Sequence, residues 1–207
     1  MASRHRRVPG AARRRTRRHE VYVFTEGEVT EPGYIDALKR RQSAFTVRVD
    51  DRHGNPAKLV RLAIEFKRVK DREAKQDRMP LEEWPDIWCV FDRDQHPDVD
   101  QWIEKARRSG VRVCFSHPCF EFWLLLHFED HAPPTGGSCN RAQTLLRKHL
   151  PPGKHVLLDR LEGRFEAART RAKSVSKQHE RDGNSLPTKQ DPSTDVWKFV
   201  DRLGATY

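Results

Sequence analysis

Short apolar stretches alternate with amphipathic ones over the first 130 residues of the chain. Stretches rich in β-branched and aromatic residues predict strands at residues 21–25, 45–49, 87–91 and 111–115. Apolar residues at helical spacing predict helices at residues 32–41, 56–75, 99–109 and 118–128. The near-continuous apolar run at 87–91 is typical of a parallel strand that is buried on both faces. The alternation predicts an α/β domain over residues 19–130, with a mostly parallel sheet flanked by helices.

The pattern changes after residue 130. A loop rich in proline and glycine comes first, and polar turn-forming residues occupy 182–193. Helical spacing predicts helices at residues 141–149, 160–181 and 194–203. We therefore expect residues 131–207 to form a helical C-terminal extension that packs on the α/β core.

The charge of the chain is unevenly distributed. The 207 residues include 40 Lys+Arg and 30 Asp+Glu, a net charge of +10, which suggests a nucleic-acid partner. Residues 1–18 hold eight arginines and no acid, so the remainder is nearly balanced, with 32 basic and 30 acidic residues. We expect residues 1–18 to be a disordered basic tail. Its candidate phosphate contacts are Arg13, Arg14, Arg15, Arg17 and Arg18.

The apolar runs and the cysteines indicate where in the cell we expect the protein to reside. The longest apolar run, around Leu125, is too short to span a membrane, and the basic start lacks the apolar core of a secretory signal. The four cysteines form no CxxC pair and are not typical of a disulfide framework. Cys89 and Cys114 lie in strand-like runs, where buried free thiols are expected. Cys114, His117 and Cys119 have poor spacing for zinc. We expect a reduced, cytoplasmic protein that does not associate with membranes.

Acidic residues follow two of the predicted strands. Glu26 follows 21–25, and Asp92 and Asp94 follow 87–91. Ligands bind beyond the carboxyl ends of strands in open parallel sheets, so neighbouring strands would bring the three carboxylates into one pocket. Such a group requires a proton or a cation, and carboxylate oxygens suit Mg²⁺ or Mn²⁺. The alternative is that the Asp-x-Asp pair forms a solvated turn or a helix cap.

Three further residues are candidates for supporting that site. Glu31 is either a fourth acid near the metal or a capping-box residue, and we favour the cap. Glu121 lies among Phe, Trp and Leu, where an unpaired carboxylate is costly, and pairing with an arginine is slightly favoured over a functional role. His117 follows the strand at 111–115 on the same rim. We expect His127 and Tyr34 to face the core.

The helix predicted at 160–181 offers basic residues for nucleic acid. Arg164, Arg171 and Lys173 are the candidate phosphate contacts, although such residues are more often solvated surface charges. The chain contains no GxxxxGK[ST] sequence, so we expect no ATPase activity of the Walker type.

Four ordered blocks carry a resemblance to known proteins. They are EGEVTEPGYIDAL (26–38), WCVFDRD (88–94), SHPCFEFWLLLHF (116–128) and DPSTDVWKFV (191–200). The first two look like the Toprim domain of primases, topoisomerases and overcoming-lysogenization-defect nucleases. Together the four blocks resemble the RloB-like family of prokaryotic restriction and abortive-infection loci, over about residues 20–203. The chain departs from that pattern at His117 and Asp191, where asparagine is expected.

The resemblance implies a fold, a reaction and partners. The fold would be a Toprim-like, Rossmann-like α/β sheet. Glu26 would be a general acid/base or metal ligand, and Asp92 and Asp94 would chelate Mg²⁺ or Mn²⁺. The activity would be phosphodiester cleavage of DNA or RNA in anti-phage defence, beside an ATPase encoded nearby, and oligomers are possible. A non-catalytic nucleic-acid-binding or sensor subunit is the alternative. A haloacid-dehalogenase-like phosphatase is disfavoured because its Asp-x-Asp pair would follow the first strand.

Overall fold

A computed structural model of the chain describes residues 18–93, 96, 98–130, 133–150, 158–205 and 207. Its sheet has five strands in the order β2-β1-β3-β4-β5. The strands are β1 (His19–Thr25), β2 (Phe45–Val49), β3 (Asp86–Asp92), β4 (Arg112–His117) and β5 (Ser193–Thr194). The first four strands pair in parallel, and β5 pairs antiparallel with β4.

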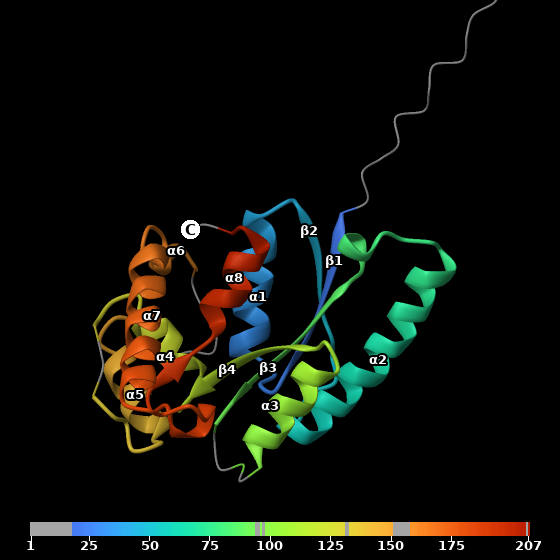
Figure 1. Cartoon of the computed structure of the whole chain (residues 1–207). Coiled ribbons are helices and arrows are strands. Elements are labelled where there is room, and N and C mark those ends of the chain that lie inside the picture. Colours follow the sequence, from blue (N-terminus) through green and yellow to red (C-terminus); the bar gives the residue numbers. More distant parts are fainter. Residues whose placement is uncertain (1–17, 94–95, 97, 131–132, 151–157, 206) are drawn as a thin grey trace, which may run out of the picture.

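Helices cover both faces of this sheet (Figure 1). One face carries α2 (Pro56–Gln76) and α3 (Val99–Arg108). The helices of the other layer are α1 (Thr30–Arg41), α4 (Phe120–Leu125), α5 (Cys139–Leu146), α6 (Leu158–Leu161), α7 (Phe165–Arg181) and α8 (Val196–Leu203). Two 3₁₀ helices, Leu81–Glu83 and Pro187–Lys189, lie in connections. The expectation of an α/β fold with a mostly parallel sheet is confirmed.

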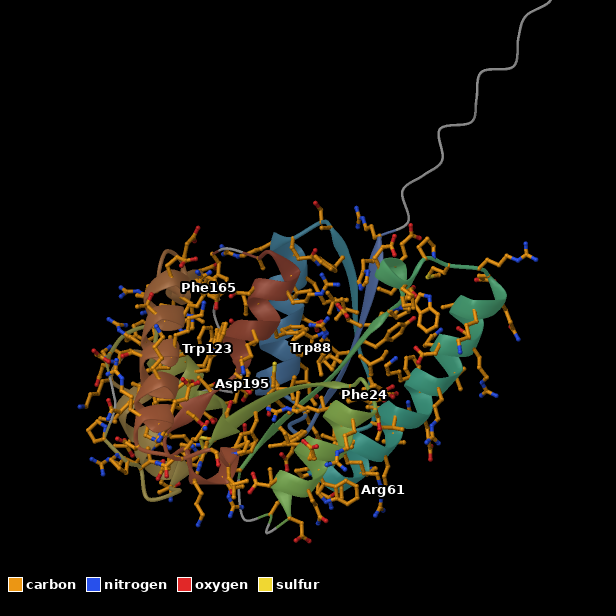
Figure 2. All side chains as sticks on the ribbon, viewed as in Figure 1. Phe24, Arg61, Trp88, Trp123, Phe165 and Asp195 are labelled. Atoms are coloured by element: carbon orange, nitrogen blue, oxygen red, sulfur yellow. A yellow bond between two sulfur atoms is a disulfide. The ribbon has the colours of Figure 1, made fainter. Side chains whose placement is uncertain are left out.

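The alternation of side chains along β3 divides the core into two layers. Trp88 and Val90 pack in the layer of α1 and α8, whereas Cys89 and Phe91 pack against α2 and α3. Figure 2 shows this division, with Trp88 on the α8 side of the sheet. Successive residues of a strand point to opposite faces, so Asp92 follows Trp88 and Val90 toward the α1 side.

The order of the strands creates a reversal between β1 and β3. The chain leaves β1 through α1 to reach β2, then returns through α2 to β3 on the other side of β1. The connection that leaves β1 leads into α1 and the one that leaves β3 leads into α3, and because α1 and α3 lie on opposite faces, the two connections diverge from the carboxyl ends of these strands. This reversal is where open α/β sheets form ligand-binding crevices.

The C-terminal region differs from the expected run of helices. β5 lies where polar turn residues and a helix start were expected, and its Thr194 hydroxyl hydrogen-bonds Ser116 of β4 at 3.1 Å. A two-residue strand has no periodicity that a sequence could reveal. The long helix expected at 160–181 is divided into α6 and α7, with Gly163 in a left-handed conformation (φ 72°) between them. None of the described helices has the length and apolar character needed to cross a membrane. The division of the chain at residue 130 stays a prediction.

Candidate metal centre

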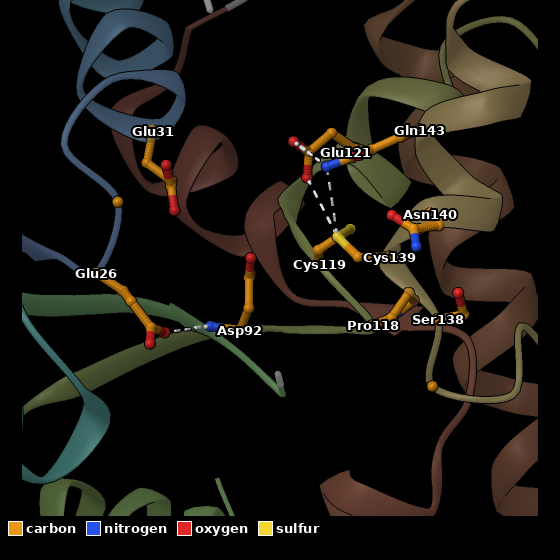
Figure 3. Close-up of a pocket in the computed structure, with 12 residues that line it drawn as sticks. Glu26, Glu31, Asp92, Pro118, Cys119, Glu121, Ser138, Cys139, Asn140 and Gln143 are labelled. Carbon is orange, nitrogen blue, oxygen red and sulfur yellow. Dashed lines mark hydrogen bonds between the residues drawn. A yellow bond between two sulfur atoms is a disulfide. The ribbon is translucent and has the colours of Figure 1, made fainter. Parts of the chain in front are cut away.

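A pocket of about 490 Å³ lies beyond the carboxyl ends of β1 and β3 (Figure 3). Four carboxylates line it, from Glu26, Glu31, Asp92 and Glu121. The described lining includes no lysine, arginine or histidine. The two strands are neighbours, as the convergence of their terminal acids requires. The geometry therefore brings Glu26 and Asp92 together at one site.

Glu26 is fixed by the ends of the two central strands. Its backbone N–H donates to the Val90 carbonyl at 3.0 Å, which extends the pairing of β1 with β3 by one residue. Its Oε2 accepts from the Asp92 backbone N–H at 3.1 Å, and its Oε1 lies 2.8 Å from Nε2 of His96. The Glu26 carboxylate is thus held at the pocket wall with an imidazole within proton-transfer distance.

Asp92 is the last residue of β3, and only one of its carboxylate oxygens is satisfied. Oδ2 accepts from the backbone N–H of Phe120, the first residue of α4, at 3.1 Å. Oδ1 is buried and has no hydrogen-bond partner among the described groups. Burial raises the pKa of Asp92 well above its usual value, and the negative charges of Glu31, Glu121 and Glu26 raise it further. An unpaired oxygen in such surroundings requires a proton or a cation.

Glu31 lies in the first turn of α1 and is 6% exposed. Burial raises the pKa of Glu31, and the charges of Glu121 and Glu26 add to this effect. The expected capping box is wrong, because the N-cap residue is Val29 and makes no side-chain cap hydrogen bond. The Glu31 carboxylate instead packs on Gly27, where any side chain would overlap it. Glu31 is therefore a fourth acid of the pocket.

Glu121 and two cysteines form the opposite wall. Oε1 of Glu121 accepts from Nε2 of Gln143 at 3.3 Å, and Oε2 lies 3.8 Å from Sγ of Cys139. The expected arginine is absent, since no arginine in the described part of the chain forms an ion pair with Glu121. Cys139 is joined to Cys119 by a disulfide. The expectation of a fully reduced chain is wrong for this pair because the fold brings α4 and α5 together, across a separation of 20 residues.

Several other expectations about single residues are confirmed. Cys89 and Cys114 are buried free thiols. Tyr34 is fully buried. Its hydroxyl contacts the Tyr207 hydroxyl and accepts a hydrogen bond from Nε1 of Trp123 at 2.9 Å. His127 is 1% exposed and lies 3.0 Å from both the Trp123 carbonyl and the Tyr207 hydroxyl. Neither Tyr34 nor His127 lines the pocket.

The remaining candidates do not join the pocket in the described structure. His117 ends β4 and is 5% exposed, and burial lowers its pKa, but it is absent from the described pocket lining. Asp94 lies outside the described residues, so its place beside Asp92 stays a prediction. Arg13, Arg14, Arg15 and Arg17 also lie outside them, and Arg18 is exposed just before β1.

The candidate basic residues in α7 and at its N-cap make contacts within the fold. Arg171 donates to the Leu126 carbonyl at 2.7 Å, and the Arg164 guanidinium lies 5.2 Å from the centre of the Phe128 ring. The ammonium of Lys173 lies 4.4 Å from the centre of the Trp197 ring and 3.9 Å from Asp201. None of these three residues belongs to the described pocket lining. Their use as phosphate contacts stays a prediction.

Sequence reasoning missed the partners of the acids. His96 lies four positions after Asp92, in the loop that follows β3, and a histidine so close to a candidate metal ligand was an available signal. Cys139 and Gln143 had no such signal. They belong to a helix that reaches the pocket only through tertiary packing of α5 on α4.

The fold and pocket define an α/β protein whose acidic site lies at the reversal of a mostly parallel sheet. The family model described as RloB-like protein matches residues 21–203, and the chain therefore belongs to the RloB-like family. A comparison with curated proteins gives no match, and a comparison with solved structures gives none. The expected resemblance is thus confirmed at the level of the family.

Proposed function

We propose that the chain is a Mg²⁺- or Mn²⁺-dependent nuclease of the Toprim type that cleaves phosphodiester bonds of nucleic acid. The observation that carries the proposal is the buried Oδ1 of Asp92, which lacks a described partner in a pocket lined by three other acids. A hard divalent cation is the ligand that such a set of oxygens suits. Glu26 and Asp92 would hold the cation, with Asp94 as a further ligand implied by the family resemblance.

The residues of the pocket support distinct tasks. When bound, the cation would stabilise negative charge that develops on the phosphate. The Glu26 carboxylate, 2.8 Å from His96, is placed to exchange a proton with water or with a leaving oxygen. The Phe120 N–H, which donates to Asp92, keeps that carboxylate oriented from the α4 side. Glu31 would add a further carboxyl group beside the cation from the first turn of α1.

The proposed setting is anti-phage defence with abortive infection. It rests on the association of RloB-like proteins with such loci, and the chain belongs to that family. The chain lacks a Walker sequence, so an ATPase encoded nearby would supply any nucleotide-driven step. Co-expression with neighbouring genes, followed by purification, tests this partnership. Full cleavage activity by the isolated chain would contradict a requirement for the partner.

Metal binding and cleavage should be measured on the same preparations. Mg²⁺ and Mn²⁺ titrations by calorimetry are compared for the wild type, Glu26→Gln and Asp92→Asn, and the same proteins are assayed on single- and double-stranded DNA and RNA. The matched control is Asp36→Asn, because Asp36 is exposed on α1, away from the pocket, and pairs with Lys39. We expect binding and cleavage by the wild type and the control, with loss of both in the two pocket variants.

Two results would contradict the proposal. One is a wild-type chain that binds neither cation, and the other is cleavage by both pocket variants at the wild-type rate. Nucleic-acid binding with metal binding but without cleavage, even with the partner present, would favour the sensor-subunit alternative over a nuclease.

A further inference from the structure

The wall of the pocket opposite Glu26 holds two sulfurs and a carboxylate (Figure 3). Cys119 directly precedes α4, Glu121 lies in the first turn of α4, and Cys139 is the first residue of α5. One ligand atom from each of these three residues lies within 4.8 Å of the other two. Figure 3 places this group apart from Glu26 and Glu31, with Asp92 between the two sides.

No lysine or arginine of the described residues forms an ion pair with Glu121. Its described contacts are an amide N–H of Gln143 at 3.3 Å and Sγ of Cys139 at 3.8 Å. No lysine or arginine belongs to the described lining of the pocket. A half-buried carboxylate beside two sulfurs is stabilised when a cation joins them.

We propose that Cys119, Cys139 and Glu121 bind Zn²⁺ when the Cys119–Cys139 disulfide is reduced. Thiolates select zinc over magnesium, so this site is chemically distinct from the oxygen-only set of Glu26, Glu31 and Asp92. With Zn–S bonds of about 2.3 Å, tetrahedral geometry places two sulfurs roughly 3.8 Å apart. The Cα atoms of the two cysteines are 5.6 Å apart, which is compatible with that spacing. The fourth position faces the pocket and is filled by water.

Reduction of the disulfide frees the two cysteine thiols to bind the metal, and oxidation to the disulfide removes both ligands. A dithiol reductant donates two electrons and two protons, which breaks the S–S bond and leaves two thiols, while the reductant forms its own disulfide. Zn²⁺ then displaces the two thiol protons as the Zn–S bonds form. Either the disulfide or the metal joins α4 to α5, so the pocket wall is cross-linked in both states.

The test uses the full chain, reduced with a phosphine that leaves thiols free, and Co²⁺ or Zn²⁺ as the probe. Tetrahedral thiolate coordination gives Co²⁺ a near-ultraviolet charge-transfer absorption. We expect one equivalent of Co²⁺ with this absorption in the reduced wild type, displaced by Zn²⁺, and none in the oxidised chain. Cys119→Ser and Cys139→Ser should abolish the absorption, and Glu121→Gln should weaken binding about tenfold or more. Cys89→Ala, in the other layer of the core, is the matched control and should bind like the wild type.

A second measurement covers variants that fail to fold. In the reduced wild type, Zn²⁺ should protect Cys119 and Cys139 from alkylation, as mapped by mass spectrometry. The proposal is overturned if the reduced wild type shows no thiolate absorption with Co²⁺, if both serine variants keep it, or if Zn²⁺ gives no protection. Glu26 and Asp92 are unchanged in all these proteins. The result is therefore independent of the proposed nuclease activity.

Discussion

Replacing Asp92 by asparagine should stabilise the metal-free protein while removing its response to Mg²⁺. In the wild type, Oδ1 of Asp92 is buried without a described partner, and three other carboxylates surround the group. An unsatisfied buried polar group costs about 1–3 kcal/mol, and a charged group costs more. Asparagine keeps an oxygen for the Phe120 N–H, which Asp92 now accepts at 3.1 Å, and adds an N–H₂ donor that faces the acids. The raised pKa of Asp92 also predicts that asparagine stabilises the metal-free protein, because ionisation of Asp92 at neutral pH opposes folding.

The magnitude follows from the size of the chain. For a domain of this length, about 1 kcal/mol shifts the Tm by roughly 2–4 °C, so metal-free Asp92→Asn should melt about 2–12 °C above the wild type. Mg²⁺ at a hundredfold excess over its Kd should stabilise the wild type by about 2.7 kcal/mol and leave the variant unchanged. Scanning calorimetry with and without Mg²⁺ measures both effects. The exposed Asp36→Asn control should shift little in either condition. A variant that is less stable without metal, or equally stabilised by Mg²⁺, would refute the reasoning.

Three further predictions concern the core, the pocket wall and the tail. Burial lowers the pKa of His127 to about 4 from 6.5, so the contribution of this neutral histidine to stability should be full above pH 6.5 and fall by roughly 3 kcal/mol as the pH drops toward 4. Urea unfolding across this range should show the loss in the wild type relative to His127→Gln, because the raised pKa values of Asp92 and Glu31 act in both proteins. Asp191→Asn should cost about 1–2 kcal/mol in urea unfolding, because Asp191 uses both carboxylate oxygens to accept from Thr135 and Gly137. An unchanged midpoint would contradict that assignment. Deletion of residues 1–18, with their eight arginines, should reduce the magnitude of the salt slope of duplex-DNA binding by at most about 7, measured by fluorescence anisotropy. An unchanged slope would show that the tail makes no phosphate contacts.

The elements that carry a periodic pattern could be predicted from the sequence. The run at 87–91 and the amphipathic spacing of 56–75 match β3 and α2 to within one residue at each end, because burial on both faces or on one stripe imposes those patterns. β5 could not be predicted, since its two residues are strand only through pairing with Ser116 and His117 of β4. The break between α6 and α7 depends on the left-handed Gly163, and a sequence with good helical spacing on both sides conceals it.

Some residues of the candidate site could likewise be predicted from the sequence, and others could not. Glu26 and Asp92 could be predicted to lie together because both stand at the carboxyl ends of strands. The structure adds that these two strands, β1 and β3, are neighbours in the sheet. The role of Glu31 required the structure, because a glutamate at a helix start fits a cap and a pocket equally well at the level of sequence. Cys139 was beyond prediction, since the loop before α5 has no pattern that fixes where the helix docks.

The contacts of Asp191 give a physical role to the fourth block of the family resemblance, residues 191–200. No residue of that block belongs to the described pocket lining, yet Asp191 accepts hydrogen bonds from the Thr135 N–H at 3.2 Å and the Gly137 N–H at 2.9 Å. Thr135 and Gly137 lie in the segment just before Cys139. Asp191 therefore holds in place the segment that carries one of the two disulfide-bonded cysteines of the pocket wall. Asparagine offers one carboxamide oxygen where Asp191 uses two carboxylate oxygens. The aspartate at residue 191, where the family resemblance leads us to expect asparagine, therefore bears on how firmly the segment before α5 is held, and it would influence the proposed metal ligands only through that segment.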